Sequence, residues 1–279
     1  AEDRWLLSLY GLYQSFDGAI DRCAVGLEGR YSGDRVSVYS LLDYDTFFDE
    51  LNIFYLFGNW RIREGTVASL TLDQRRSPGL ALSNAVYGLG GDDFDDLDSE
   101  YSRDELERLA EDRSLIYRSA YASLTQQLDE RWQLLLDGGI YSLREDSGAP
   151  GNDNLDSDDW YLYGQFVGNG LFKSGDLFSV GLRYTDAERM DTTSVLLRGR
   201  APVNERLRLT PQLRVDWRDR DDGDSQRRVL PSLFTTYRLS KRTSLELDVG
   251  IEFSHFDRDE GDDQDDRFLY LSAGYRHDF

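Results

Sequence analysis

Hydrophobic and polar residues alternate along most of this chain with a period of two. The clearest segment is "LRLTPQLRVDW" (residues 207–217), in which apolar residues such as Leu209 occupy odd positions and polar residues such as Arg208 occupy even ones. The segment "TSLELDVGIEF" (243–253) repeats the pattern. Successive side chains of a β-strand point to opposite faces, so both segments predict strands with one apolar and one polar face.

Fourteen segments of this kind are separated by residues typical of turns. They span 4–15, 21–31, 35–45, 50–62, 66–76, 114–126, 131–144, 159–168, 177–187, 192–201, 206–218, 228–239, 243–256 and 267–279. The first, sixth and eighth are ambiguous, so twelve or sixteen strands stay open. These segments are about twice as long as strands of soluble sheets. An all-β fold is therefore expected, a transmembrane antiparallel up-and-down β-barrel.

The connections between segments offer an independent test, because outer-membrane barrels alternate short periplasmic turns with longer external loops. The even-numbered connections are compact: 32–34, 63–65, 128–130, 169–176, 202–205 and 239–242. The odd-numbered ones include the longer stretches 77–113, 145–159, 219–227 and 257–266, while those near 16–20 and 187–191 are short. An even strand count places both termini at the periplasmic end, and we expect one barrel domain over residues 1–279.

Composition narrows the function classes. The chain has 53 acidic and 32 basic residues, a net charge of -21, which makes nucleic acid an unsuitable partner because phosphate contacts need clustered cations. No run of about 18 to 20 apolar residues predicts a spanning helix. Tryptophan and tyrosine gather toward segment ends, as interfacial girdles do. The girdle residues are Trp5, Tyr13, Tyr31, Tyr55, Trp60, Trp132, Trp160, Tyr184, Trp217 and Tyr237. The competing fold is a soluble acidic β-sandwich.

The last eleven residues, "LYLSAGYRHDF", resemble the C-terminal strand of Gram-negative outer-membrane proteins, which alternates apolar residues and ends on an aromatic one, here Phe279. This resemblance implies location in the outer membrane of a Gram-negative bacterium and recognition by the barrel-assembly machinery. Outer-membrane lipid and lipopolysaccharide would be partners there.

A second resemblance lies in "LLDYDTFFDELNIFYLFGNW" (41–60) and "LTLDQRRSPGLALSNAVYG" (70–88). Both stretches are similar to C-terminal barrels of envelope proteins that carry tetratricopeptide repeats, among them polysaccharide exporters and surface-lipoprotein translocators. The resemblance implies a periplasmic repeat domain or an export partner.

If the apolar set faces lipid, the polar set lines a lumen. Its basic stripe would comprise Arg183, Arg198, Arg200, Arg206, Arg208, Arg214 and Arg218. Its acidic residues would be Asp43, Asp45, Asp73, Glu246, Asp248 and Glu252. Facing stripes of opposite charge would orient a polar solute. In the competing interpretation, these charges pair across neighbouring strands and only keep the wall hydrated, each pair contributing about 0.2 to 1 kcal/mol.

The stretch "SRDELERLAEDR" (102–113) breaks the strand pattern. Ser102 followed by Glu105 matches a helix capping box, and Leu106, Leu109 and Ala110 recur at helical spacing. A short helix in the long external loop is expected. If the helix folds inward, its acidic residues would meet the basic stripe and narrow the pore; otherwise it lies over the mouth. Those residues are Asp104, Glu105 and Glu107.

Catalytic and metal-binding patterns are weak. His255 and His277 are the only histidines; His277 falls on the lipid-facing register, and His255 could pair with an acid at the external rim. Three acidic runs offer oxygen ligands for calcium but lack the twelve-residue loop pattern. We expect no enzyme, cofactor or metal. The preferred function is an outer-membrane channel or translocation barrel that passes a polar or charged solute; the alternative is a barrel module of a larger export or assembly machine. A lipid-modifying or proteolytic enzyme ranks third.

Overall fold

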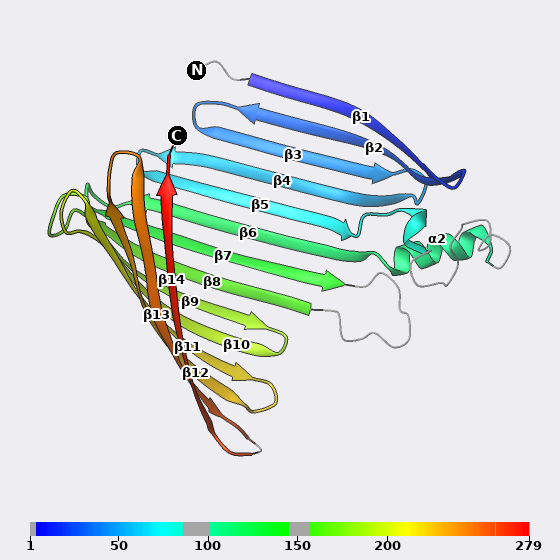
Figure 1. The fold of residues 1–279 in the computed structure, drawn as a ribbon. Coiled ribbons are helices and arrows are strands. Elements are labelled where there is room, and N and C mark those ends of the chain that lie inside the picture. Colours follow the sequence, from blue (N-terminus) through cyan, green and yellow to red (C-terminus); the bar gives the residue numbers. More distant parts are fainter. Residues whose placement is uncertain (1–3, 86–100, 145–156, 260, 279) are drawn as a thin grey trace. The chain divides into compact units, whose positions relative to one another are not determined.

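The chain forms one sheet of fourteen antiparallel β-strands, as the alternation predicts (Figure 1). The structure, a computed structural model, describes residues 4–85, 101–144, 157–259 and 261–278. The strands are β1 (Arg4–Phe16), β2 (Ala19–Ser32), β3 (Val36–Asp45), β4 (Glu50–Arg63), β5 (Thr66–Ser77), β6 (Leu115–Gln127), β7 (Trp132–Arg144), β8 (Ser157–Asn169), β9 (Leu177–Ala187), β10 (Met190–Pro202), β11 (Leu207–Arg220), β12 (Ser225–Arg238), β13 (Thr243–Asp257) and β14 (Gln264–His277). Each lies within three residues of its predicted bounds.

The order of strands in the sheet follows the order in the chain from β1 to β14. Every strand therefore pairs with its sequence neighbours, which confirms the predicted up-and-down topology. Within the described residues, the strand register shifts after Gln14, Asp43 and Arg61, at β-bulges or similar irregularities. Since β1 and β14 stand at the two ends of the order, closure through pairing of these strands stays a prediction.

The turns follow from local backbone chemistry. Asp17 and Gly18 connect β1 and β2 with φ angles of 46° and 81°, the left-handed pair that a two-residue hairpin requires and that glycine favours. The six connections 33–35, 64–65, 128–131, 170–176, 203–206 and 239–242 lie at one end of the strands, here named the short-turn end. The other end, which carries 78–114, is the long-loop end. There 46–49 is also short, so the length alternation is less strict than expected.

The chain divides into two compact units. The first comprises residues 1–123 and 139–159, and the second residues 124–138 and 160–279. Within the described ranges, no helix has the length and apolar character needed to cross a membrane. The expectation of a single domain stays a prediction.

The two faces of the sheet have inverted burial. In the second unit, Ser194 and Asp216 lie opposite each other and are 2% and 0% exposed, whereas Leu182 on the other face is 56% exposed. The first unit shows the same contrast, with Asp43 at 3% and Leu9 at 82%. Soluble proteins bury their large apolar side chains. We name the two sides the polar face and the apolar face.

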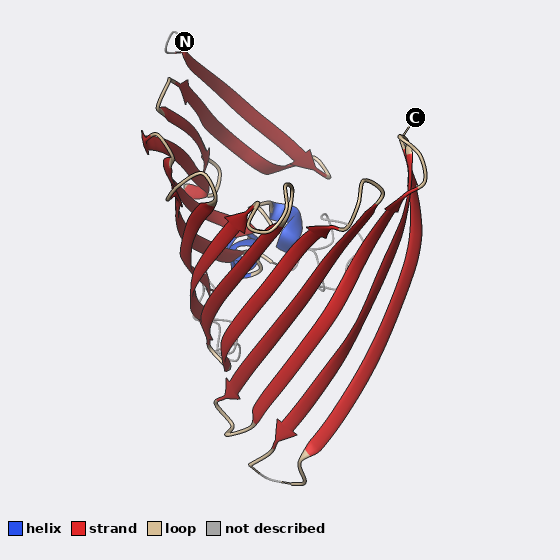
Figure 2. Ribbon diagram, turned by 90° about the vertical axis from the view of Figure 1, so that its left-hand side faces the viewer, coloured by secondary structure: helices blue, strands red, loops and turns tan. Residues whose placement is uncertain are grey.

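The predicted helix is confirmed as α2 (Arg103–Asp112), in the connection between β5 and β6. In Figure 2, the described residues outside this connection form strands joined by loops and turns. The helix begins after Ser102, whose backbone N–H and hydroxyl both donate to the Glu105 carboxylate at 2.8 Å. These bonds lower the pKa of Glu105. The capping residues read from the sequence therefore do start the helix.

A small hydrophobic core joins this connection to the strand tips of the first unit. Its buried residues come from α2, from the 3-10 helix η1 (Leu82–Ala85) and from neighbouring segments: Phe48, Leu80, Leu82, Ala85, Leu106 and Ala110. Two backbone N–H groups, of Leu80 and Ser83, donate to Asn52 (3.3 Å) and Asp21 (2.7 Å). The described parts of the connection are thus packed against β2 and β4.

Candidate functional site

The polar face of β10–β13 holds a cluster of charges centred on Asp216. One carboxylate oxygen of Asp216 accepts hydrogen bonds of 2.7 Å from Arg214 Nε and from Ser194 Oγ. The other lies 3.8 Å from guanidinium nitrogens of Arg218 and Arg228. Arg228 also donates to Glu252 at 2.6 Å. Three arginines meet two carboxylates here, so the cluster has a net positive charge.

The first unit has a comparable but more acidic cluster. Arg22 Nη2 lies 2.5 Å from Asp43, and its Nε lies 3.3 Å from Asp45. Asp43 accepts two further hydrogen bonds, from Tyr10 Oη at 2.9 Å and from Asn52 Nδ2 at 3.0 Å. One arginine therefore serves two buried carboxylates. The neutral donors Tyr10 and Asn52 thus satisfy hydrogen-bonding capacity of Asp43 that Arg22 leaves open, as a buried carboxylate requires.

The other predicted acidic residues lie separately. Asp73 is paired with Arg75, two residues further along β5. Glu246 lies opposite Thr236 on β12, and Asp248 lies opposite Phe234. Glu252 alone joins the Asp216 cluster, and Asp43 and Asp45 share Arg22.

The predicted basic stripe is only partly a continuous group. Arg183 lies opposite Ser194, and its guanidinium stacks 4.5 Å from the centre of the Tyr161 ring. Arg198 and Arg200 lie on the same polar face of β10, opposite Gln212 and Leu177. Arg206 lies in the turn that precedes β11, because this strand begins at Leu207, and its place in the basic stripe stays a prediction. The predicted segment 206–218 therefore begins one residue before the observed strand.

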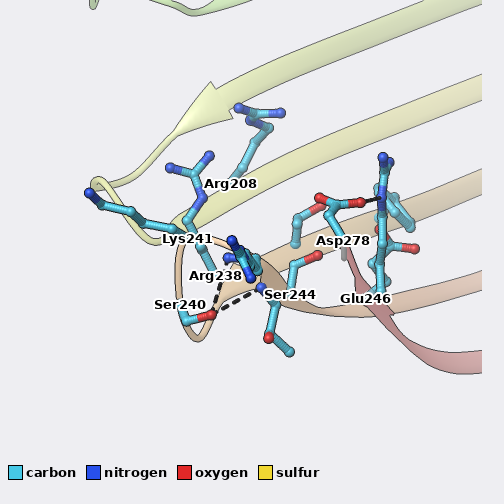
Figure 3. A pocket seen from close by; sticks show the side chains of 12 residues that line it. Arg208, Arg238, Ser240, Lys241, Ser244, Glu246 and Asp278 are labelled. Atoms are coloured by element: carbon cyan, nitrogen blue, oxygen red, sulfur yellow. Dashed lines mark hydrogen bonds and ion pairs between the residues drawn. The ribbon is translucent and has the colours of Figure 1, made fainter.

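A basic pocket opens at the short-turn end of the polar face. It has a volume of about 580 Å³, and Figure 3 shows Arg208, Arg238 and Lys241 extending from neighbouring segments around it. Five of its lining residues are basic: Arg208, Arg238, Lys241, Arg242 and Arg276. Two are acidic, Glu246 and Asp278, and Asp278 accepts a 3.0 Å hydrogen bond from Arg276. The pocket thus has an excess of cationic groups.

Four basic residues of this pocket were missed by sequence reasoning: Arg238, Lys241, Arg242 and Arg276. Arg238 and Arg276 lie on the same face of their strands as the residues predicted to face the lumen. The alternation in the sequence could therefore have identified them. The turn "LSKR" (239–242) supplied the other two. The Ser240 hydroxyl accepts hydrogen bonds from the backbone N–H groups of Arg242 (3.2 Å) and Thr243 (3.1 Å), which fixes that turn.

Charge is separated along the strand direction. The seven connections at the long-loop end have a net charge of −20, compared with −21 for the whole chain, whereas the six short turns sum to zero. Together with the basic pocket, this distribution makes the short-turn end far less negative than the long-loop end. A charged solute would meet a different environment at each end.

The helix α2 lies in the first unit, and the basic stripe lies in the second. Asp104 and Glu105 are exposed, and Glu107 pairs with Arg103 at 3.2 Å. The buried side of the helix, with Leu106 and Ala110, faces the small core. Narrowing of a pore by the acidic residues of α2 stays a prediction.

Two other expectations concern histidine and metal. His255 Nδ1 lies 2.7 Å from Asp265 Oδ1, on the apolar face near the long-loop end, and His277 shares that face at the short-turn end. Among the described residues, no group of three or more histidines, cysteines or acids is arranged to hold a metal ion. The acidic run at 90–100 and most of the run at 151–159 lie outside the described residues. The same is true of residue 260 in the run at 257–266.

One girdle assignment was wrong. Tyr55 lies on the polar face, opposite Leu41 and Asp73, because β4 carries large side chains on both faces. The other nine predicted girdle residues fall on the apolar face, with contacts such as Trp5–Tyr31 (4.6 Å between ring centres) at the short-turn end and Trp160–Tyr184 (5.2 Å) at the long-loop end.

Neither a protein-family model nor a curated protein sequence matches this chain. Several solved outer-membrane proteins are similar to it in structure. A bacterial polysaccharide outer membrane secretin is 12% identical with a TM-score of 0.49, over 99% of this chain and 86% of its own. An anion-selective porin from Comamonas acidovorans is 12% identical with a TM-score of 0.43, over 99% and 100%. The outer membrane channel DcaP of Acinetobacter baumannii is 11% identical with a TM-score of 0.40, over 98% and 97%. Similarities at this level define neither a family nor a function.

Proposed function

We propose that this protein is a transmembrane β-barrel of the Gram-negative outer membrane and that its polar face lines a channel for a charged solute. One observation carries the proposal. Buried charged groups occupy one face of a long antiparallel sheet, while large apolar side chains are exposed on the other, as with Asp216 (0%) and Leu182 (56%). A bilayer is the environment in which an exposed apolar face is stable.

Closure follows from the same argument. β1 and β14 stand at the ends of the strand order, and long unpaired edges are unstable in lipid because no water satisfies their backbone groups. Pairing of β1 with β14 would remove both edges. The exposed Leu9 and Leu271 (82% and 69%) would then face the hydrocarbon.

The distance between the aromatic rows supports a membrane of ordinary thickness. Trp217 belongs to the aromatic row at the long-loop end, and its partner on β12 is Arg227. Tyr237, which belongs to the row at the short-turn end, lies ten residues further along β12. Ten residues span roughly 33 Å along a strand. At the tilt usual in barrels, about 40°, this corresponds to roughly 25 Å across the membrane, which is the height of the apolar band in known barrels.

The preferred solute is an anion. Two features of the second unit support this: the Asp216 cluster has three arginines for two carboxylates, and the short-turn pocket has five basic residues for two acidic ones. Arginine recognises carboxylate and phosphate groups through paired N–H donors. We propose that the pocket receives the anion at the periplasmic mouth of the channel.

Planar bilayers test this function. The purified protein should form ion-conducting pores, and in a salt gradient its reversal potential should indicate preference for anions. The double variant R208Q/R238Q should shift that potential toward cations. K173Q is the matched control, since Lys173 lies in another short turn, where its Nζ bonds Val203 O at 2.9 Å. A protein that inserts but does not conduct, or a double variant with unchanged selectivity, contradicts the proposal.

The alternative function is a barrel module of an export or assembly machine. The basic pocket favours it, because the short-turn end is where a periplasmic partner or an exported acidic polymer would arrive. This alternative predicts no conductance from the isolated barrel. It also predicts that R208Q/R238Q lowers binding of an acidic polysaccharide such as polyuronate, while K173Q does not.

A further inference from the structure

We infer that the apolar face carries a binding site for the phosphorylated headgroup of an outer-leaflet glycolipid, at the long-loop end of β12–β14. The inference rests on the membrane orientation proposed above but concerns the opposite face of the sheet from the channel. Its key residues are Arg227, His255 and Arg267. All three are exposed.

The strand register brings these residues together. Trp217, Arg227, His255 and Asp265 lie opposite one another in one row across β11–β14. Arg267 belongs to the next row toward the short-turn end, directly opposite Phe253. Both arginines line one surface pocket of about 460 Å³, together with His255 and the carboxylates of Asp265 and Asp266. Two cations, one from β12 and one from β14 on the other side of β13, thus border a single depression at the height of an aromatic row.

An internal contact positions Arg267, and neither Arg227 nor Arg267 is neutralised by an ion pair with another described residue. The Arg267 guanidinium lies over the Phe253 ring, 5.0 Å from its centre, which holds it by a cation–π contact. The Asp265 carboxylate is engaged by His255 at 2.7 Å. Within the described part of the chain, neither Arg227 nor Arg267 forms an ion pair. An anion from outside the protein can therefore bind both guanidinium groups.

The location explains why the anion should belong to a lipid. Arginine on the lipid-facing register is unfavourable within the hydrocarbon and tolerated near the headgroups. Beyond Arg267 toward the short-turn end, Leu269 and Leu271 continue the same face of β14 and are 66% and 69% exposed. Phosphate at the arginines and acyl chains on these leucines would match a phosphorylated amphiphile. A soluble phosphate would contact only the arginines and not the leucines.

Binding to the protein in detergent micelles tests the inference directly. The probes are bisphosphorylated lipid A, the same lipid without phosphates, and inorganic phosphate, with complexes measured by native mass spectrometry. The variant R227Q/R267Q should bind bisphosphorylated lipid A at least about tenfold more weakly than the wild type. The control R220Q should bind normally, because Arg220 lies at the same end of β11 but on the polar face.

The outcomes separate this inference from the proposed channel. Equal affinity of wild type and R227Q/R267Q, or equal affinity for the phosphate-free lipid, would overturn it. Inorganic phosphate binding as tightly as lipid A would also overturn it, in favour of a soluble anion. Folding is checked by the shift in gel mobility on heating. R227Q/R267Q should conduct as the wild type does, whereas loss of the channel function would leave lipid A binding intact.

Discussion

The ring of Tyr10 on β1 lies directly over Gly26, its partner on β2. A Cβ atom added to Gly26 would lie 2.0 Å from Cζ of that ring. Glycine is therefore required here for space. The close approach allows the Tyr10 hydroxyl to donate to Asp43 at 2.9 Å, which links three strands of the first unit. The aromatic ring also covers the backbone at the glycine, as in other β-proteins that pair the two residues.

Replacement of Gly26 with alanine should displace the Tyr10 ring and break its bond to Asp43. We expect G26A to lower the free energy of unfolding by about 1 to 3 kcal/mol, the range for an overpacked site. Gly58 is the matched control, because a Cβ at this position meets nothing within 4 Å. Urea unfolding in detergent measures both variants. Equal stability of G26A and G58A would show that the ring moves without cost.

The sequence was sufficient for the strands and their faces, since alternation is a local property. It also located α2, because Ser102 and Glu105 lie within one helical turn. It could not assign ionic partners. Arg22 meets Asp43 and Asp45 across the interface between β2 and β3, and the Asp216 cluster draws on four strands. Such pairs depend on register, and bulges such as that after Asp43 shift register without a sequence signal.

The small core in the β5–β6 connection should be locally stable. Leu106 is fully buried in it, so L106A should open the described part of this connection, at a cost of about 2 to 5 kcal/mol to the local structure. Limited proteolysis should then cut near α2 much faster than in the wild type. L109A is the control, because Leu109 is only partly buried. Unchanged cleavage of L106A would mean that α2 is held by its hydrogen bonds instead.

The turn between β8 and β9 should depend on pH. Burial alone would raise the pKa of Asp176, but backbone N–H groups of residues 170–173 outweigh it and lower that pKa. Those of Leu171, Phe172 and Lys173 each donate to the carboxylate at 2.8 Å. A lowered folded pKa means that the carboxylate stabilises the turn fully above about pH 4, the ordinary aspartate value, and that this stabilisation is lost as the pH falls through the lowered value.

Hydrogen exchange can follow this transition. Exchange of the amides of Leu171, Phe172 and Lys173, corrected for intrinsic rates, should accelerate below pH 4 in the wild type. D176N should show fast exchange already at neutral pH. D129N is the control, since Asp129 accepts similar bonds from Arg131 and Trp132 in another turn. Slow exchange in D176N would mean that the turn is held by its backbone geometry alone.

The buried carboxylate of Asp216 should set both the stability and the selectivity of the channel wall. The variant D216N removes the negative charge that three arginines surround: Arg214, Arg218 and Arg228. The loss of each charge-assisted contact weakens the wall. We expect the unfolding free energy to fall by about 2 kcal/mol and the preference for anions to increase, because the cluster gains one net positive charge. D219N is the control, since Asp219 lies three residues further along β11 on the apolar face. Reversal potentials measure the effect. If D216N and D219N give the same potential, the permeating ions do not sense the polar face at Asp216, and the lumen must lie elsewhere than on this wall.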